Sequence, residues 1–243
     1  MTADTIIHRL QRNGTQRPND PAYYVKRNGT WHPTSWGTYL SEVRQAARAL
    51  IALGVEPGGT VSILGFNRAE WVIFDLAAMM IGGVGVGIYT TNSPHEVEYI
   101  VDNSESSIIL LEDLGQLDKV RQVREELDNL EHVIMMKDND EYPDAFSWEA
   151  FMSKGNEVEE SAVDARLAQL DEEQLATLIY TSGTTGPPKG VMLSHKNIAW
   201  TAKQAVDMFN IRPSDSTLSY LPLSHIAEQS FTVHGAITAG YQV

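Results

Sequence analysis

The chain has 243 residues, of which 42% are hydrophobic, and this is enough for one large domain or two small ones. Its formal net charge of −14 argues against a nucleic-acid partner, because binding to a phosphate backbone relies on basic side chains. The absence of cysteine excludes disulfide bonds, thiolate metal sites and a cysteine nucleophile.

The hydrophobic segments are too short or too interrupted to predict a membrane span. Residues 1–30 lack an apolar core of signal-peptide length. The most apolar window, residues 71–89, is interrupted by glycines. We therefore expect a cytoplasmic protein, with peripheral contact with a membrane as the alternative.

The first 34 residues are polar and contain three prolines. Residues 22–25 and the segment around Trp31 are predicted to pair as a hairpin, because Asn28-Gly29 between them is typical of a type I′ turn. We expect a structural role for this segment and no chemistry.

Strands and helices then alternate as far as residue 136. A helix is predicted from about Ser35 to Leu53. Thr34 or Ser35 can cap its start, and Gly54 suits its end. The remaining elements predicted in this region are strands over 61–66, 82–88, 107–111 and 132–136, and helices over 70–81, 96–103 and 116–127. Such alternation with short connections predicts an α/β fold with doubly wound, largely parallel sheets and flanking helices. The glycines at 82–87 indicate close packing of a central strand, since no helix begins there as a dinucleotide fingerprint would require.

An acidic segment follows. Residues 138–173 hold twelve Asp or Glu but only Lys154 and Arg166 as basic residues, which indicates a solvated face and a linker. We therefore predict a first α/β subdomain over residues 1–170, with its hairpin and acidic linker, and the start of a second α/β subdomain over residues 171–243.

Residues 180–191, YTSGTTGPPKGV, carry most of the functional information. A predicted strand over 176–180 leads into them, and another over 191–193 follows. The glycines allow successive backbone N–H groups to face one anion. Further donors come from one ammonium and four hydroxyl groups, those of Lys189, Thr181, Ser182, Thr184 and Thr185. This set predicts a polyphosphate-binding loop rather than an ordinary turn, although its glycine spacing is not that of a Walker A loop.

Three further elements are predicted after this loop. Ser194 is expected to cap a helix that reaches Phe209 and places Ile198, Ala202, Ala205 and Phe209 inward. A strand over 217–221 follows, and residues 222–228 then lead into a helix that reaches about Gly240. We expect His195 and Lys196, at the start of the first of these helices, to be ordinary exposed residues. The alternative is a position near the phosphates.

The second informative stretch is 220–229, YLPLSHIAEQ. The imidazole of His225 could donate a hydrogen bond to a carboxylate and to the charge that develops when it reacts. The ordinary alternative is a histidine at a helix start whose ring bonds to the backbone. Glu228, three residues further on, would either orient His225 or lie as a solvated carboxylate on the surface.

These stretches resemble known motifs. Residues 180–191 are similar to the phosphate-binding signature of the adenylate-forming (AMP-binding) superfamily, which includes acyl-CoA synthetases, luciferases and peptide-synthetase adenylation domains. Residues 220–228 resemble the next motif of that superfamily, in which Pro-Leu-x-His leads into a helix lining the acyl pocket. Residues 87–94 (GIYTTNSP) and 225–229 (HIAEQ) resemble the bubblegum-like branch of the long-chain fatty acyl-CoA synthetases.

The resemblance implies an enzyme that forms an acyl-adenylate from ATP and a fatty acid, and then a thioester with coenzyme A. It implies that Thr181 helps to hold Mg²⁺, which uses few protein ligands when it is bound to phosphates. It also implies catalytic roles for Lys189, which neutralises the phosphates, and for His225 beside the carboxylate. The β- and γ-phosphates would be wrapped by residues 182–186, that is Ser182, Gly183, Thr184, Thr185 and Gly186.

The resemblance covers only the N-terminal part of such an enzyme. The later Tyr-Gly-x-Thr-Glu motif, the ribose-binding Asp and the C-terminal domain with its catalytic Lys have no counterpart in these residues. We therefore expect residues 1–243 to be inactive on their own. Two other functions stay open: a non-catalytic module that binds nucleotide or polyphosphate, and a folded interaction fragment.

Overall fold

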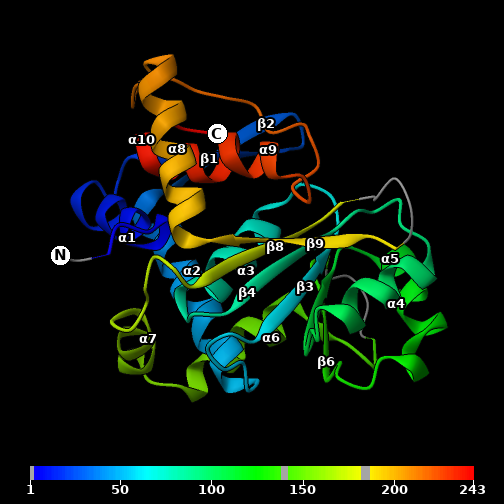
Figure 1. The fold of residues 1–243 in the computed structure, drawn as a ribbon. Helices are drawn as coiled ribbons and strands as arrows, with labels where there is room; N and C mark the ends of the chain where they lie inside the picture. Colours follow the sequence, from blue (N-terminus) through cyan, green and yellow to red (C-terminus); the bar gives the residue numbers. More distant parts are fainter. Residues whose placement is uncertain (1–2, 138–141, 182–186) are drawn as a thin grey trace.

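The computed structural model describes residues 3–137, 142–181 and 187–243 (Figure 1). The strands are β1 (Pro21–Arg27), β2 (Thr30–Ser35), β3 (Thr60–Leu64), β4 (Val84–Ile88), β5 (Ile108–Leu111), β6 (His132–Met135), β7 (Phe146–Ser147), β8 (Leu175–Thr181) and β9 (Lys189–Ser194). The helices are α1 (Ile6–Gln16), α2 (Trp36–Ala52), α3 (Ala69–Met80), α4 (Pro94–Asn103), α5 (Leu114–Gln122), α6 (Trp148–Lys154), α7 (Glu160–Leu167), α8 (His195–Phe209), α9 (Ile226–Glu228) and α10 (Ala236–Ala239). Two short 3₁₀ helices, η1 (Arg124–Glu126) and η2 (Gly155–Glu157), and a π-helix, η3 (Gln229–Gly235), complete the set.

A seven-stranded sheet forms the centre of the molecule, with the strand order β7-β6-β5-β3-β4-β8-β9. Every neighbouring pair in it is parallel except the antiparallel pair β8–β9 at one edge. The hairpin β1–β2 is a separate two-stranded sheet. This arrangement confirms the predicted α/β class with a largely parallel sheet.

Both faces of the central strands are buried, as a doubly wound sheet requires. Successive residues alternate between two apolar clusters, so that Leu110 packs on one face of β5 and Leu111 on the other. Residues of α2, α3 and α6 cover the first face, and residues of α4 and α5 cover the second (Figure 1).

The predicted helix starts and turns are confirmed where local chemistry decides them. Ser35 Oγ accepts a hydrogen bond from the backbone N–H of Thr38, at 3.2 Å, and α2 begins at the next residue. Gly54 after this helix has φ +86°, the left-handed conformation typical of a helix end. Asn28 and Gly29 have φ of 49° and 80°, and they join β1 to β2 as a type I′ turn does.

The glycines of β4 confirm the expectation of close packing. Gly85 lies directly over the side chain of Asp75 on α3, and a Cβ atom at this position would overlap the carboxylate. Asp75 is only 1% exposed, so this contact is in the core between helix and sheet.

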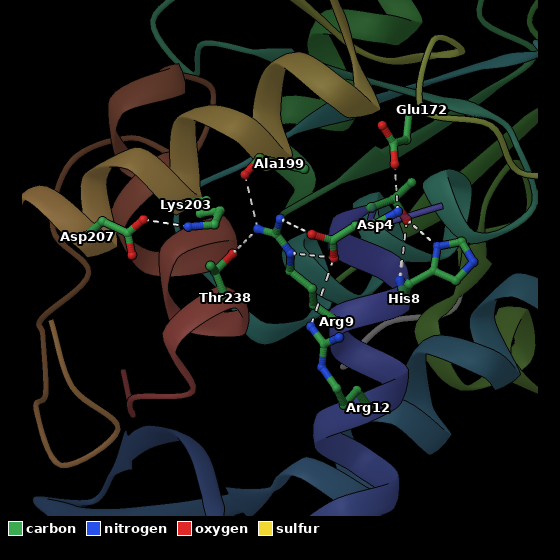
Figure 2. A network of polar contacts seen from close by, with 10 residues as sticks. Asp4, His8, Arg9, Arg12, Glu172, Ala199, Lys203, Asp207 and Thr238 are labelled. Carbon is green, nitrogen blue, oxygen red and sulfur yellow. Dashed lines mark hydrogen bonds and ion pairs between the residues drawn. The ribbon is translucent and has the colours of Figure 1, made fainter. Parts of the chain in front are cut away.

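Helix α1 was not among the predicted elements. It packs against α2, α8 and α10, so that the two ends of the chain lie side by side (Figure 1). The buried guanidinium of Arg9 joins these elements, as Figure 2 shows. It forms two hydrogen bonds with Asp4, at 2.9 and 2.7 Å, and donates to the carbonyl of Ala199 (3.0 Å) and the hydroxyl of Thr238 (2.8 Å).

The acidic segment is more than a solvated linker, which corrects the sequence prediction. Its described part, from residue 142 onwards, contains α6, η2 and α7, all packed against α2. Phe151 and Val163 are fully buried there, and Arg44 of α2 forms ion pairs with Glu160 (2.5 Å) and Asp164 (2.7 Å). Strand β8, which follows this segment, pairs with β4 in the same large sheet. The proposed division of the chain between residues 170 and 171 stays a prediction.

The C-terminal elements differ from the prediction in two respects. Helix α8 begins after Ser194 as expected, but Phe209 at its end is 63% exposed instead of buried. The strand predicted over 217–221 is not formed. Next to these residues there is an isolated bridge between Ser216 and Gln242. The last predicted helix is present as the succession α9, η3 and α10. Within the residues that the structure describes, no helix is long and apolar enough to cross a membrane.

Candidate functional site

The predicted phosphate-binding loop connects the two strands of the β8–β9 hairpin. Thr181 is the last residue of β8 and Lys189 the first of β9, and the two are directly paired in the antiparallel register. Both are exposed at the carboxyl end of β8. The hairpin therefore presents a hydroxyl and an ammonium group on either side of one loop. Its residues Ser182, Gly183, Thr184, Thr185 and Gly186 lie outside the described residues, and their role stays a prediction.

Tyr180 anchors the base of this hairpin. Its side chain is buried, and its hydroxyl donates a hydrogen bond of 2.7 Å to Oδ1 of Asn103 at the end of α4. Burial raises the pKa of Tyr180 to about 12, so the hydroxyl stays protonated as this bond requires. Gly190 is the residue paired with Tyr180, and a Cβ atom there would lie only 3.2 Å from the ring. The glycine thus makes room for the aromatic anchor.

A cleft of about 240 Å³ connects this hairpin to the helix that follows His225. Thr181 from β8 and Ile226 from α9 both line it. The other lining residues come from β8, β9, α8 and η3, and are Ile179, Val191, Leu193, Asn197, Ile198, Thr201 and Ser230. The structure therefore brings one end of the predicted phosphate loop and the start of the predicted acyl-side helix to the same cleft. Lys189 and His225 lie outside its lining.

His225 occupies the N-cap position of α9 and is exposed. Its Nδ1 accepts a hydrogen bond of 3.1 Å from the backbone N–H of Ala227. This contact is the ordinary one for a histidine at a helix start. It also assigns the proton of a neutral ring to Nε2, and this N–H donor has no partner among the described residues. The catalytic role of His225 stays a prediction.

The side chain of Glu228 neither bonds to His225 nor lies on the surface, so both sequence interpretations of this residue were wrong. Its carboxylate is buried and accepts hydrogen bonds from the hydroxyl of Ser219 (2.6 Å) and the backbone N–H of Leu221 (3.2 Å). These partners precede His225 in the chain. Glu228 therefore holds the segment that leads into the helix, instead of the imidazole itself.

The expectation for His195 was also wrong, whereas Lys196 is exposed as expected. His195 is fully buried, and burial lowers its pKa to about 4, with a smaller effect from the charge of His8. It is therefore a neutral core residue at the start of α8. Lys196 beside it is 57% exposed and pairs with Glu173 at 2.5 Å.

A larger cavity, of about 630 Å³, lies between the β1–β2 hairpin, the start of α3 and the segments η3 and α10. Aromatic side chains contribute much of its wall, namely Tyr23, Tyr24, Trp31, Trp36 and Tyr39. It contains none of the residues that the sequence singled out for chemistry. Sequence patterns did not predict this cavity, because its walls come from several segments far apart in the chain.

Comparison with known proteins relates this geometry to a family. Residues 10–243 match the family of AMP-binding enzymes. The long-chain-fatty-acid–CoA ligase ACSBG2 of Xenopus laevis is 42% identical over 234 residues, which are 93% of this chain and 32% of that protein. The human ligase ACSBG1 is 37% identical over 244 residues, 98% of this chain and 34% of that protein. The chain thus spans about a third of the length of these relatives, and the predicted resemblance to the bubblegum-like branch is confirmed.

Solved structures show the same fold. The anthranilate CoA ligase AuaEII, in complex with anthranoyl-AMP, superposes with a TM-score of 0.88 at 26% identity, over 100% of this chain and 45% of that one. A fatty acyl CoA synthetase of Mycobacterium tuberculosis superposes with a TM-score of 0.81 at 21% identity, over 98% of this chain and 44% of that one. Since the family match covers nearly the whole sequence, the chain belongs to the AMP-binding enzymes.

Proposed function

We propose that this chain is the N-terminal part of an ATP-dependent long-chain fatty acid–CoA ligase. One observation carries the proposal: a single cleft joins the end of the phosphate loop at Thr181 to the helix that His225 begins, in a chain of the AMP-binding family. The ligase relatives that it matches are about three times as long. The reaction therefore belongs to the complete enzyme, and we expect residues 1–243 to be inactive alone.

The proposed reaction has two steps. A fatty acid carboxylate attacks the α-phosphorus of ATP, which forms the acyl-adenylate and releases pyrophosphate. The thiol of coenzyme A then attacks the acyl carbon, which forms the thioester and releases AMP. In the first step two anions must be held together, so that positioning and electrostatic stabilisation account for most of the rate increase.

The residues of this chain serve the first step. The ammonium of Lys189, at the opening of the β8–β9 hairpin, would neutralise charge on the phosphates. The Nε2–H of His225 would donate to the carboxylate and to the charge that develops on it. Tyr180 and its bond to Asn103 keep the hairpin in place for both.

Magnesium is implied by the family resemblance, and the donor set of the chain fits it. No group of three or more His, Asp or Glu that could hold a metal exists in residues 3–137, 142–181 and 187–243. Mg²⁺ that is bound mainly by phosphate oxygens and water needs only one or two protein ligands. The exposed hydroxyl of Thr181 would be such a ligand. When bound, the ion would reduce the negative charge that the attacking carboxylate meets.

The test is fatty-acid-dependent exchange of labelled pyrophosphate into ATP by the complete enzyme. Lys189→Ala should lower the rate roughly 10²-fold, the order of effect of one lost electrostatic contact in a transition state. Lys203→Ala is the matched control, because Lys203 is exposed on α8 and pairs only with Asp207, among the described residues, at 2.5 Å. Unchanged exchange in Lys189→Ala would refute the role of this lysine. ATP binding without any fatty-acid-dependent exchange would favour a polyphosphate-binding module instead.

A further inference from the structure

The segment that carries His225 is held by side chains from outside it, one of them distant in the chain. We call residues 219–225 the histidine loop. It is irregular, since it contains no helix and no strand. Its hydrogen bonds to Asn67 and Glu228 connect this irregular segment to its surroundings.

Asn67 follows β3, at the carboxyl edge of the sheet. Its Nδ2 donates to the hydroxyl of Ser219 (2.7 Å) and to the carbonyl of Leu221 (2.6 Å). Its Oδ1 accepts from the backbone N–H of Leu223, at 3.0 Å. Both ends of the amide thus bond to the histidine loop, and a residue 152 positions earlier in the sequence fixes three of its residues.

Glu228 holds the same loop from the other side. Its two carboxylate oxygens accept from the hydroxyl of Ser219 and the N–H of Leu221. The side chain is buried, and it forms no ion pair with any residue that the structure describes. A buried carboxylate without a cation is costly, so its hydrogen bonds to the loop are needed to keep it there. The hydroxyl of Ser219 connects the two clamping residues, since it accepts from Asn67 and donates to Glu228.

Two further contacts place the loop against the rest of the fold. A Cβ atom at Gly87 of β4 would lie 2.9 Å from the Cα atom of Ser224, so the glycine lets the loop approach the sheet closely. The side chain of Gln229 donates to the carbonyl of Leu223, at 2.8 Å. The loop is thus fixed between the carboxyl edge of the sheet and the helix that it starts.

We propose that Asn67 and Glu228 are positioning residues for His225, which they hold through the histidine loop. The proposal rests on the role of His225 in the proposed function. Neither residue needs to touch a substrate: the backbone N–H of His225 bonds to the carbonyl of Pro222 (2.9 Å), so a displaced loop moves the imidazole with it. Loss of either clamp would let the Nε2–H leave its position beside the cleft.

The experiment measures pyrophosphate exchange by the complete enzyme with Asn67→Ala, Glu228→Gln and Ser219→Ala, alone and combined with His225→Ala. Each clamp variant should lower kcat by about 10-fold to 10²-fold, the order of loss that a displacement of about 1 Å produces, while the KM for ATP stays unchanged. Combined with His225→Ala, the same substitutions should have no further effect on kcat, because the group that they position is gone.

Ser219→Ala keeps the test decisive if the larger changes prevent folding, since it removes a single hydroxyl. Asn129→Ala and Glu125→Gln are matched controls on exposed residues outside the site. Equal losses of kcat with and without the His225 imidazole would overturn the positioning role and show a merely structural one, as would no loss in any clamp variant. If His225→Ala itself exchanges at the wild-type rate, the proposed role of His225 fails, and the positioning role with it.

Discussion

Asp75 offers a direct test of the energetics of the core. It lies on α3, is 1% exposed, and neither carboxylate oxygen has a hydrogen-bond partner among the described residues. Burial alone raises its pKa from 3.8 to about 7. A carboxyl group in this position is therefore kept neutral in the folded protein at pH values where it would be ionised in the unfolded chain.

The sign of the pH effect follows from proton binding. Between pH 3.8 and about 7 the folded state holds a proton on Asp75 that the unfolded state has lost, so the free energy of unfolding falls as the pH rises. At 1.36 kcal/mol per pH unit, this interval corresponds to about 4 kcal/mol. The stabilisation is complete below pH 3.8 and is lost as the pH rises through about 7.

Asp75→Asn should remove this dependence, because the amide does not titrate. The measurement is urea-induced unfolding at several pH values from 4 to 8, followed by tryptophan fluorescence. The difference in unfolding free energy between wild type and variant should change by up to about 1.4 kcal/mol per pH unit and level off above pH 7. Asp102→Asn, an exposed change on α4, is the control and should show no such trend. Parallel curves for wild type and Asp75→Asn would refute the reasoning.

Two further changes test contacts that hold the molecule together, both by urea-induced unfolding. Arg9→Met should lower the free energy of unfolding by about 3 kcal/mol, because two charged hydrogen bonds from the buried Arg9 to the C-terminal helices are lost (Figure 2). Arg12→Met, at a 52% exposed side chain 4.0 Å from Asp4, should cost less than about 1 kcal/mol, and equal effects would contradict the role of Arg9. Gly190→Ala should cost about 1–3 kcal/mol, because the added Cβ atom forces the ring of Tyr180 to move. An unchanged urea midpoint would show that the ring has room.

The sequence predicted best those elements whose starts and turns depend on neighbouring residues alone. The helix after Ser35 and the hairpin at Asn28 depend on capping and turn chemistry, which acts over a few residues. Helix α1 was missed because its apolar residues are few and one of its buried side chains is a charged arginine. Only the contacts of Arg9 with Ala199 and Thr238, at the other end of the chain, explain its burial.

The candidate site, too, was predicted only where a short stretch of sequence carries the signal. The motifs around Thr181 and His225 could be found from residue types and spacing, and they lie at one cleft. The partner of Glu228 could not be found in this way. A spacing of three residues predicted contact with His225, but the irregular loop brings Ser219 closer. Asn67 gave no signal at all, since its partners are more than 150 positions away in the chain.

The direction of the strands explains why these distant segments meet. Because β8 runs parallel to β4, and β4 to β3, the carboxyl ends of all three strands lie at the same edge of the sheet. Thr181 ends β8 and Asn67 follows β3, so the phosphate loop and the clamp on the histidine loop begin from this one edge. In open α/β sheets ligands bind outside the carboxyl ends of the strands. Strand β9 then leads the chain into α8 and back to the same edge. There Ser224 packs against Gly87 of β4, and the next residue, His225, begins α9.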